Sequence, residues 1–181
     1  DGWLHTGDMG YICPFDPDFL YVVGRFKSLL ISSDGEKYSP EGFEDSLPEV
    51  SKYVASAVLH NNQSPYTIVL IVPEKETLAE YVKGKGMDPA SEDGKKAMLA
   101  KIQEEIDTYR KGQSHEGLFP ERWLPAAVVI CDEPFTIANK MMNSTMKMVR
   151  GKVEEHYADR IEYAYTPEGK NLFNQKNLAS L

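Results

Sequence analysis

The chain has 181 residues, of which 41% are hydrophobic and 27% are charged, as expected of an ordinary soluble globular protein. Its 28 acidic and 20 basic residues give a formal net charge of -8, which argues against a nucleic-acid-binding module because phosphate neutralisation needs a basic face. No apolar run approaches the roughly 20 residues that span a bilayer. Cys13 and Cys131 lack zinc-type spacing, so we expect free thiols in a reducing, cytoplasmic compartment.

The start of the chain predicts short strands and turns. It has no initiator methionine and no basic and apolar regions of a signal peptide, so we expect a piece of a longer protein. Apolar and aromatic residues at 9–13 and 19–23 flank the turn-forming residues 14–18, and this spacing predicts a β-hairpin. A third apolar run at 29–31 stops at the small polar loop 32–35.

The first predicted helix follows this loop. Ser39 is expected as its N-cap and Pro40 as its first helical residue, because the fixed φ and missing N–H of proline suit that position. Phe43 and Leu47 lie four residues apart and would share the buried face. Pro48 is expected to end the helix, since proline cannot donate the next backbone hydrogen bond.

The rest of the chain alternates strand and helix patterns. Residues 68–72 are apolar throughout, as expected for a strand that is covered on both faces. Apolar residues between 98 and 109 repeat at helical spacing. We predict strands at 53–59, 67–72 and 125–131, a turn at 61–65, helices at 74–83, 91–110 and 147–157, and packing of Phe119 and Trp123 on the core.

These elements together predict an α+β fold, with about three helices on a small mixed sheet and a short β-hairpin in front. The polar composition and weak periodicity after residue 160 predict an irregular tail. We therefore divide the chain into a hairpin segment at 1–27, a main domain at 28–159 and a tail at 160–181.

Three short segments carry residue types suited to ribose or phosphate. Asp8 follows a tight glycine turn, and its carboxylate can accept hydrogen bonds from a vicinal diol or can cap its own turn. Arg25 and Lys27 share one face of an extended strand, where they can bind phosphate or protect a sheet edge. Lys147 follows a polar loop, where its ammonium can neutralise phosphate oxygens or simply face solvent.

Taken in order, these segments resemble the adenylate-forming superfamily of acyl-CoA synthetases, luciferases and peptide-synthetase adenylation domains. Residues 3–8, WLHTGD, are similar to the WxxTGD motif of that family. Residues 24–44 are similar to its GRxKxxI…GExxxPxxxE segment, in which Glu44 is the last position. Residues 135–150 resemble the FTxENGLLTPTxKxKR-like stretch of long-chain acyl-CoA synthetases, in which Lys147 stands at the catalytic lysine.

The match has two departures, both before Lys147. Lys140 stands where relatives often have glycine, and Ser144 stands where many have proline, which puts the path of this loop in question. Lys27 favours acyl- or aryl-CoA ligases over peptide-synthetase domains, which usually have aspartate at that position.

The resemblance implies two half-reactions, which make an acyl-adenylate from ATP and a fatty acid and then transfer the acyl group to coenzyme A. It implies a preceding N-terminal domain as partner, and that domain would hold ATP and its Mg²⁺ for the most part. It implies no metal site in this chain and a fragment that is inactive alone. It is also compatible with peripheral membrane association of the full-length enzyme. It assigns Asp8 to the ribose hydroxyls, Arg25 to the ribose or phosphate, Lys27 to the hinge, Lys147 to catalysis, and the loop of Ser32, Ser33, Asp34, Gly35 and Glu36 to the incoming thiol.

Two other functions remain open at this point. A non-catalytic docking or regulatory module with the same α+β fold would use Arg25 and Lys147 as ordinary surface charges. An adenylating enzyme with a carrier-protein acceptor would keep the first half-reaction and change the second.

Overall fold

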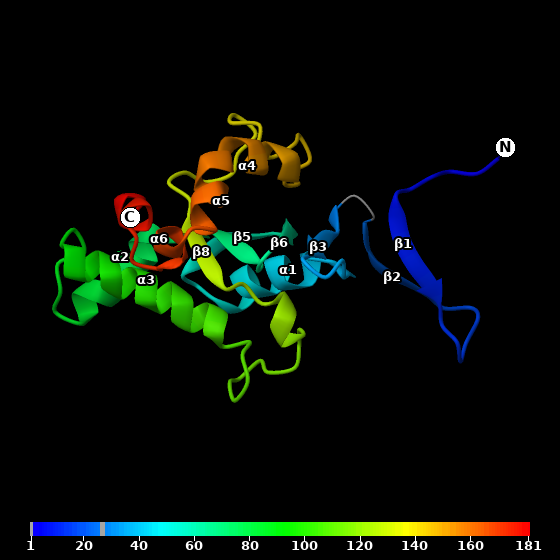
Figure 1. Cartoon of the computed structure of the whole chain (residues 1–181), viewed down its shortest axis with the longest axis horizontal. Helices are drawn as coiled ribbons and strands as arrows, with labels where there is room; N and C mark the ends of the chain where they lie inside the picture. The colour runs from blue at the N-terminus through cyan, green and yellow to red at the C-terminus, as the bar shows by residue number, and fades with distance from the viewer. Residues whose placement is uncertain (1, 26–27) are drawn as a thin grey trace.

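A central three-stranded sheet organises the domain in the computed structural model, which describes residues 2–25 and 28–181 (Figure 1). Its strands are β5 (Val54–His60), β7 (Ile68–Pro73) and β8 (Ala127–Ile130). β7 lies in the middle, antiparallel to β5 and parallel to β8. Every residue of β7 is buried, which confirms the prediction of a strand covered on both faces.

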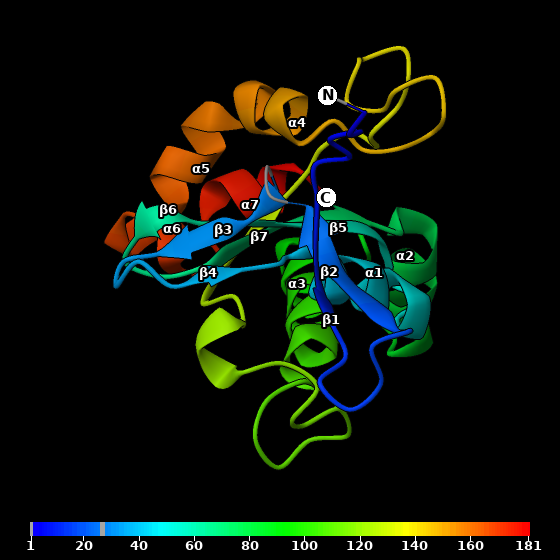
Figure 2. The same cartoon turned by 90° about the vertical axis from the view of Figure 1, so that its right-hand side faces the viewer.

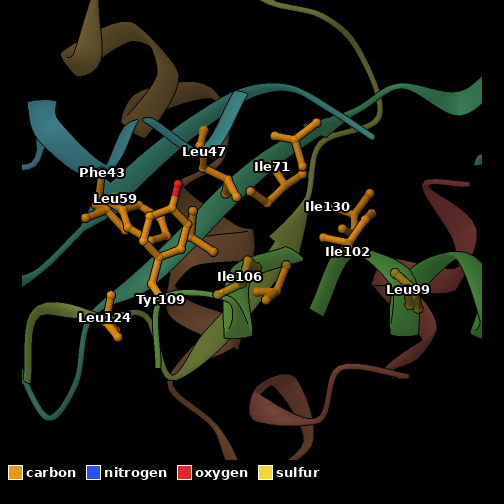
Figure 3. Packing of buried hydrophobic residues seen from close by; sticks show 14 of the residues in the cluster. Phe43, Leu47, Leu59, Ile71, Leu99, Ile102, Ile106, Tyr109, Leu124 and Ile130 are labelled. Atoms are coloured by element: carbon orange, nitrogen blue, oxygen red, sulfur yellow. The ribbon is translucent and has the colours of Figure 1, made fainter. Parts of the chain in front are cut away.

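Helices cover the two faces of this sheet and create two cores. Val69 and Ile71 point into a core shared with α1, α2 and α3, part of which is seen in Figure 3. Ile68 and Leu70 point to the opposite face, into a core shared with α4 and α5. The alternation follows from the two-residue period of a strand. The helices of these layers are α1 (Glu41–Val50), α2 (Lys75–Gly84), α3 (Glu92–Asp107), α4 (Arg150–His156) and α5 (Ala158–Ala164).

A second, smaller sheet is built from β3 (Leu30–Ser32), β4 (Lys37–Tyr38) and β6 (Asn62–Ser64), in the order β4-β3-β6. β3 is antiparallel to β4 and parallel to β6. The sequence predicts a turn at 61–65, but β6 occupies part of it. A strand made of polar residues is possible at this position because β6 is only three residues long and remains largely exposed.

The predicted β-hairpin is confirmed. β1 (Asp8–Ile12) pairs antiparallel with β2 (Leu20–Arg25), and Figure 1 shows the pair standing apart from the helical layers. Tyr11 and Tyr21 stack across the hairpin with their ring centroids 5.1 Å apart. Cys13 is half-buried and Cys131 is buried, and both are free thiols.

The first helix differs from its prediction at both ends, although Phe43 and Leu47 are buried as expected. α1 begins at Glu41 with Pro40 as its N-cap, and no side chain, including that of Ser39, caps it. Pro48 lies inside the helix instead of ending it. The lost backbone bond is tolerated because α1 continues for only two more residues and Leu47 anchors this turn in the core.

The other predicted helices are present with shifted ends. Ser91 caps α3 by accepting a hydrogen bond from the Gly94 N–H at 3.0 Å, but the helix ends at Asp107. α4 begins at Arg150, three residues later than predicted, because residues 142–148 form a small turn of their own. Phe119 and Trp123 pack against the core, as expected.

The prediction of an irregular tail is wrong. Residues after 160 complete α5 and then form α6 (Pro167–Lys170) and α7 (Gln175–Ala179). Asn177 is 1% exposed and bonds the outer edge of β8, where its Oδ1 accepts from the Ile130 N–H at 3.0 Å and its Nδ2 donates to the Val128 carbonyl at 2.9 Å. A side chain thus takes the place of a further strand and protects the edge.

Replacing Asn177 by alanine should therefore lower the free energy of unfolding by about 2 kcal/mol, since two buried backbone groups of β8 would lose their partners. Urea denaturation of the chain measures this loss. The exposed Asn171, which accepts a hydrogen bond from the Phe173 N–H at 2.9 Å, provides the control. Asn171→Ala should cost less than about 0.5 kcal/mol. Equal losses from the two substitutions would contradict the edge role.

No helix within residues 2–25 and 28–181 is long and apolar enough to cross a membrane.

Candidate functional site

Lys147 is exposed and lies on the turn of residues 142–148 that precedes α4. The segment before α4 is at the upper edge of the molecule in Figure 1. The base of this turn is closed by an isolated antiparallel bridge between Met142 and Met148. Its tip is closed by a hydrogen bond from the Asn143 N–H to the Lys147 carbonyl at 2.9 Å. The lysine side chain is therefore presented to solvent on a backbone that is held at both ends.

A buried ion pair anchors the chain just after this turn. Arg150, the first residue of α4, donates to both carboxylate oxygens of Glu44 at 2.8 and 2.6 Å and to the Leu59 carbonyl at 2.7 Å. Glu44 Oε1 also accepts from the Leu59 N–H at 2.6 Å. Burial raises the pKa of Glu44, and the charge of Arg150 opposes that rise. The pair ties α1, β5 and α4 together three residues beyond Lys147.

An open groove connects this turn with the β-hairpin. Figure 2 looks onto the side that carries the hairpin, with the loop before α4 above it. Asp8, at the start of β1, lines the same groove as Lys147. The structure thus brings two of the predicted site residues to one surface. Apolar and polar side chains share the remaining lining, among them Glu41, Phe119, Trp123, Phe135 and Met146.

The predicted thiol-facing loop connects β3 and β4 and does not line this groove. Gly35 has a φ of 84°, a left-handed conformation that favours glycine. The Gly35 N–H donates to the Ser32 carbonyl at 2.9 Å, and the Glu36 N–H donates to Asp34 Oδ1 at 3.1 Å. Hydrogen bonds from the Ser32 hydroxyl and from this N–H lower the pKa of Asp34. Ser33, also exposed, completes a pre-formed turn.

Glu36 is held by a second ion pair at the end of this loop. Arg122, in the short 3-10 helix Glu121–Trp123, donates through Nε and through a terminal nitrogen to the two Glu36 oxygens at 2.6 and 2.5 Å. These hydrogen bonds lower the pKa of Glu36. The Arg122 side chain is 62% exposed, so this pair is weak compared with the buried one.

Two predicted residues are described only in part or not at all. The backbone of Arg25 pairs with that of Asp8 across the hairpin, which places the two positions opposite each other, while the Arg25 side chain is not described. Lys27, the predicted hinge, lies outside the described residues.

The sequence does not predict the contacts that hold the turn of residues 142–148, called the lysine turn below. Glu44 and Arg150 were visible as motif positions, but nothing in their spacing indicates that they pair. Lys140 has a φ of 62°, which explains why glycine suits this position, and Met146 has a φ of 59°. The signal that could have revealed the turn is Asn143, because asparagine readily bonds the backbone of the residues that follow it.

These features define a small α+β domain that presents a lysine on a constrained turn, with an acidic loop on a separate edge. The chain belongs to the AMP-binding enzyme C-terminal domain family, which matches residues 27–169.

Known relatives are considerably longer than this chain. It is 27% identical to the long-chain-fatty-acid–CoA ligase ACSBG2 of Gallus gallus, over 91% of this chain and 23% of that protein. It is 30% identical to the long-chain-fatty-acid–CoA ligase 1 of Homo sapiens, over 92% of this chain and 23% of that protein. The adenylation domain of a carboxylate reductase from Mycobacterium chelonae is similar in structure, with a TM-score of 0.71 and 25% identity over 88% of this chain and 22% of that one. The chain thus spans less than a quarter of these relatives.

Proposed function

We propose that this chain is the C-terminal domain of an ATP-dependent acyl-CoA ligase whose carboxylate substrate is a fatty acid. The observation that carries the proposal is the exposed Lys147 on a constrained turn, at the position where the family resemblance expects the catalytic lysine. The names of the relatives, which are fatty-acid–CoA ligases, support the substrate class.

In the first half-reaction, a carboxylate oxygen attacks the α-phosphorus of ATP. The bond from this phosphorus to the bridging oxygen breaks, and pyrophosphate leaves with the electron pair. Lys147 would stabilise the negative charge that develops on the phosphoryl oxygens, because an ammonium placed beforehand needs no rearrangement during the reaction. Asp8 would accept hydrogen bonds from the ribose hydroxyls, and Arg25 would assist at the ribose or phosphate.

In the second half-reaction, the sulfur of coenzyme A attacks the acyl carbon, the bond from this carbon to the phosphate oxygen breaks, AMP leaves with the electron pair, and the thiol proton is released to solvent. The turn of residues 32–36 would guide the thiol arm through its backbone groups. This turn does not line the groove that Asp8 and Lys147 share, which favours two orientations of the domain, one for each half-reaction. Lys27 would be the hinge between them.

Mg²⁺ enters with ATP in this proposal, and no residue of this chain is assigned to it. Across the part of the chain that the structure describes, no three His, Cys, Asp or Glu side chains are grouped closely enough to hold a metal ion.

The preceding region of the full-length protein would be the partner of this chain. Large apolar side chains of the hairpin segment are unusually exposed, including Trp3 at 86% and Phe15 at 95%. The family match begins only at residue 27, after this segment. An apolar surface of this kind favours a covering partner.

A carrier-protein acceptor is the second candidate. The structural similarity of this chain to the A-PCP didomain of a carboxylic acid reductase from Segniliparus rugosus supports it, because that protein joins an adenylation domain to a carrier domain. Presenting the full-length protein with palmitoyl-adenylate and either coenzyme A or a phosphopantetheinyl carrier protein separates the two candidates by the thioester that forms.

The full-length protein should catalyse exchange between ATP and labelled pyrophosphate when palmitate is supplied, whereas the 181-residue chain alone should not. The reason is that the phosphate-binding loop and acyl pocket expected of the family have no counterpart in this sequence. Exchange by the isolated chain would contradict its assignment as a dependent domain. Absence of exchange and of thioester formation by the full-length protein, with a panel of fatty acids, would favour the non-catalytic docking module instead.

A further inference from the structure

The tip of the lysine turn is organised around one side-chain oxygen. Asn143 Oδ1 accepts from the Thr145 N–H at 3.0 Å, from the Thr145 hydroxyl at 2.8 Å and from the Lys147 N–H at 2.9 Å. The backbone of Asn143 adds a bond from its N–H to the Lys147 carbonyl at 2.9 Å and accepts one from the Met146 N–H at 3.0 Å. Asn143 therefore bonds both backbone polar groups of Lys147.

This turn needs such support because its backbone is unfavourable. Met146 lies in the left-handed region at a φ of 59°, which an L-residue with a side chain adopts at a cost. Met146 is also 72% exposed, so its side chain contributes little packing to offset that cost. The hydrogen bonds of Asn143 are the contacts that favour the observed path at the tip.

The base of the turn is held by different contacts. The Val149 N–H donates to the carbonyl of the fully buried Met141 at 2.8 Å, and Arg150 is fixed by its ion pair with Glu44. Loss of the Asn143 side chain should therefore loosen the tip and leave the base and α4 in place. Its effect should be confined to the position of Lys147.

We propose that Asn143 is a positioning residue for Lys147, which fixes the lysine backbone so that the ammonium reaches the same point in each turnover. The proposal deepens the function proposed above and depends on the role of Lys147 in adenylation. Asn143 touches no reacting atom in this account. It acts by narrowing the positions available to a long, flexible side chain, and a displacement of about 1 Å at a reacting group is enough to slow a reaction severalfold or more.

The first test measures the hydrogen bond from the Lys147 N–H to Asn143 Oδ1 and does not depend on enzymatic activity. Hydrogen exchange of the Lys147 amide, followed by NMR in the 181-residue chain, should be slowed in the wild type and in Asn143→Asp, which keeps the acceptor oxygen. Asn143→Ala should exchange at least about tenfold faster at this amide, because the acceptor is lost. Fast exchange of the wild-type amide would overturn the proposal regardless of what the full-length protein catalyses.

The second test uses the full-length protein with palmitate. Asn143→Ala should lower kcat for ATP–pyrophosphate exchange about tenfold, while thioester formation from supplied palmitoyl-adenylate changes less than about twofold. Asn143→Asp should restore most of the exchange rate. Asn171→Ala, which removes a similar exposed turn contact far along the chain, should leave both steps unchanged. Equal losses in the two steps, or no rescue by Asn143→Asp, would reduce Asn143 to a structural residue.

The two proposals fail in different ways. If Lys147→Ala leaves exchange intact, the role of the lysine fails. If Lys147→Ala abolishes exchange and Asn143→Ala does not change it, the lysine role stands and the positioning role of Asn143 is refuted.

Discussion

Arg150→Met should destabilise the chain by about 3–5 kcal/mol, because the substitution leaves the carboxylate of Glu44 buried without its counter-charge. Glu44 is 7% exposed, and two hydrogen bonds from the guanidinium would be lost, together with the one to the Leu59 carbonyl. Urea denaturation of the 181-residue chain measures the loss. The midpoint should fall with little change in the slope of the transition.

Arg122→Met is the matched control for this prediction. Arg122 also makes a two-point contact with a carboxylate, at 2.6 and 2.5 Å, but its side chain is 62% exposed. Water can replace its contacts, so we expect a cost of at most about 1 kcal/mol. If Arg150→Met costs no more than Arg122→Met, burial does not govern the strength of these pairs and our account of the anchor is wrong.

A double substitution tests whether the penalty comes from the abandoned charge. Glu44→Gln removes the charge but keeps an oxygen that can accept the Leu59 N–H. Combined with Arg150→Met, it should recover more than half of the stability lost in the single variant, since an uncharged pair costs less to bury. A double variant as unstable as the single one would show that lost packing, and not the charge, is responsible.

Local patterns predicted the central parts of the fold. The apolar run of β7 indicated burial on both faces, and this is where the two cores meet. The hairpin followed from turn residues between two apolar strands, and α3 followed from helical spacing after Ser91. In each case the residues that determine the element lie within the element or next to it.

The features that could not be predicted depend on partners far along the chain. The tail after residue 160 is polar, yet Asn177 is buried because it bonds to β8, which lies 47 residues earlier. Glu44 and Arg150 are 106 residues apart. Polar side chains normally indicate exposed surface, and only the folded chain reveals which of them replace backbone or charge partners.

The candidate site also combines features that local patterns predict with features that they do not. The motif order predicted Lys147 and Asp8 as site residues, and both line one groove. The helix expected to start at Lys147 starts at Arg150 instead, because Met148 is held in a bridge with Met142 and the backbone of Val149, with a φ of -102° and a ψ of 84°, is not helical. A pattern of residue types can indicate which side chain carries the chemistry, whereas the turn that holds it depends on hydrogen bonds such as those of Asn143.

Lys147→Ala in the full-length protein should lower the rate of adenylation by about 10²–10³-fold, the usual effect of removing one preorganised charge contact from a developing anion. ATP–pyrophosphate exchange with palmitate measures this step. Thioester formation from supplied palmitoyl-adenylate should change only severalfold at most, because no phosphorus centre reacts in the second half-reaction. The contrast between the two steps is the essential result, since misfolding would lower both.

Lys152→Ala provides the matched control. Lys152 lies five residues further along on α4, is exposed, and pairs with Glu155 at 2.7 Å across one helical turn. Its removal changes the net charge by the same amount, so a general electrostatic effect on ATP binding would appear in both variants. We expect Lys152→Ala to retain both half-reactions. Similar losses in the two lysine variants would mean that the surface charge of the domain matters and that Lys147 has no special place at the reacting phosphate.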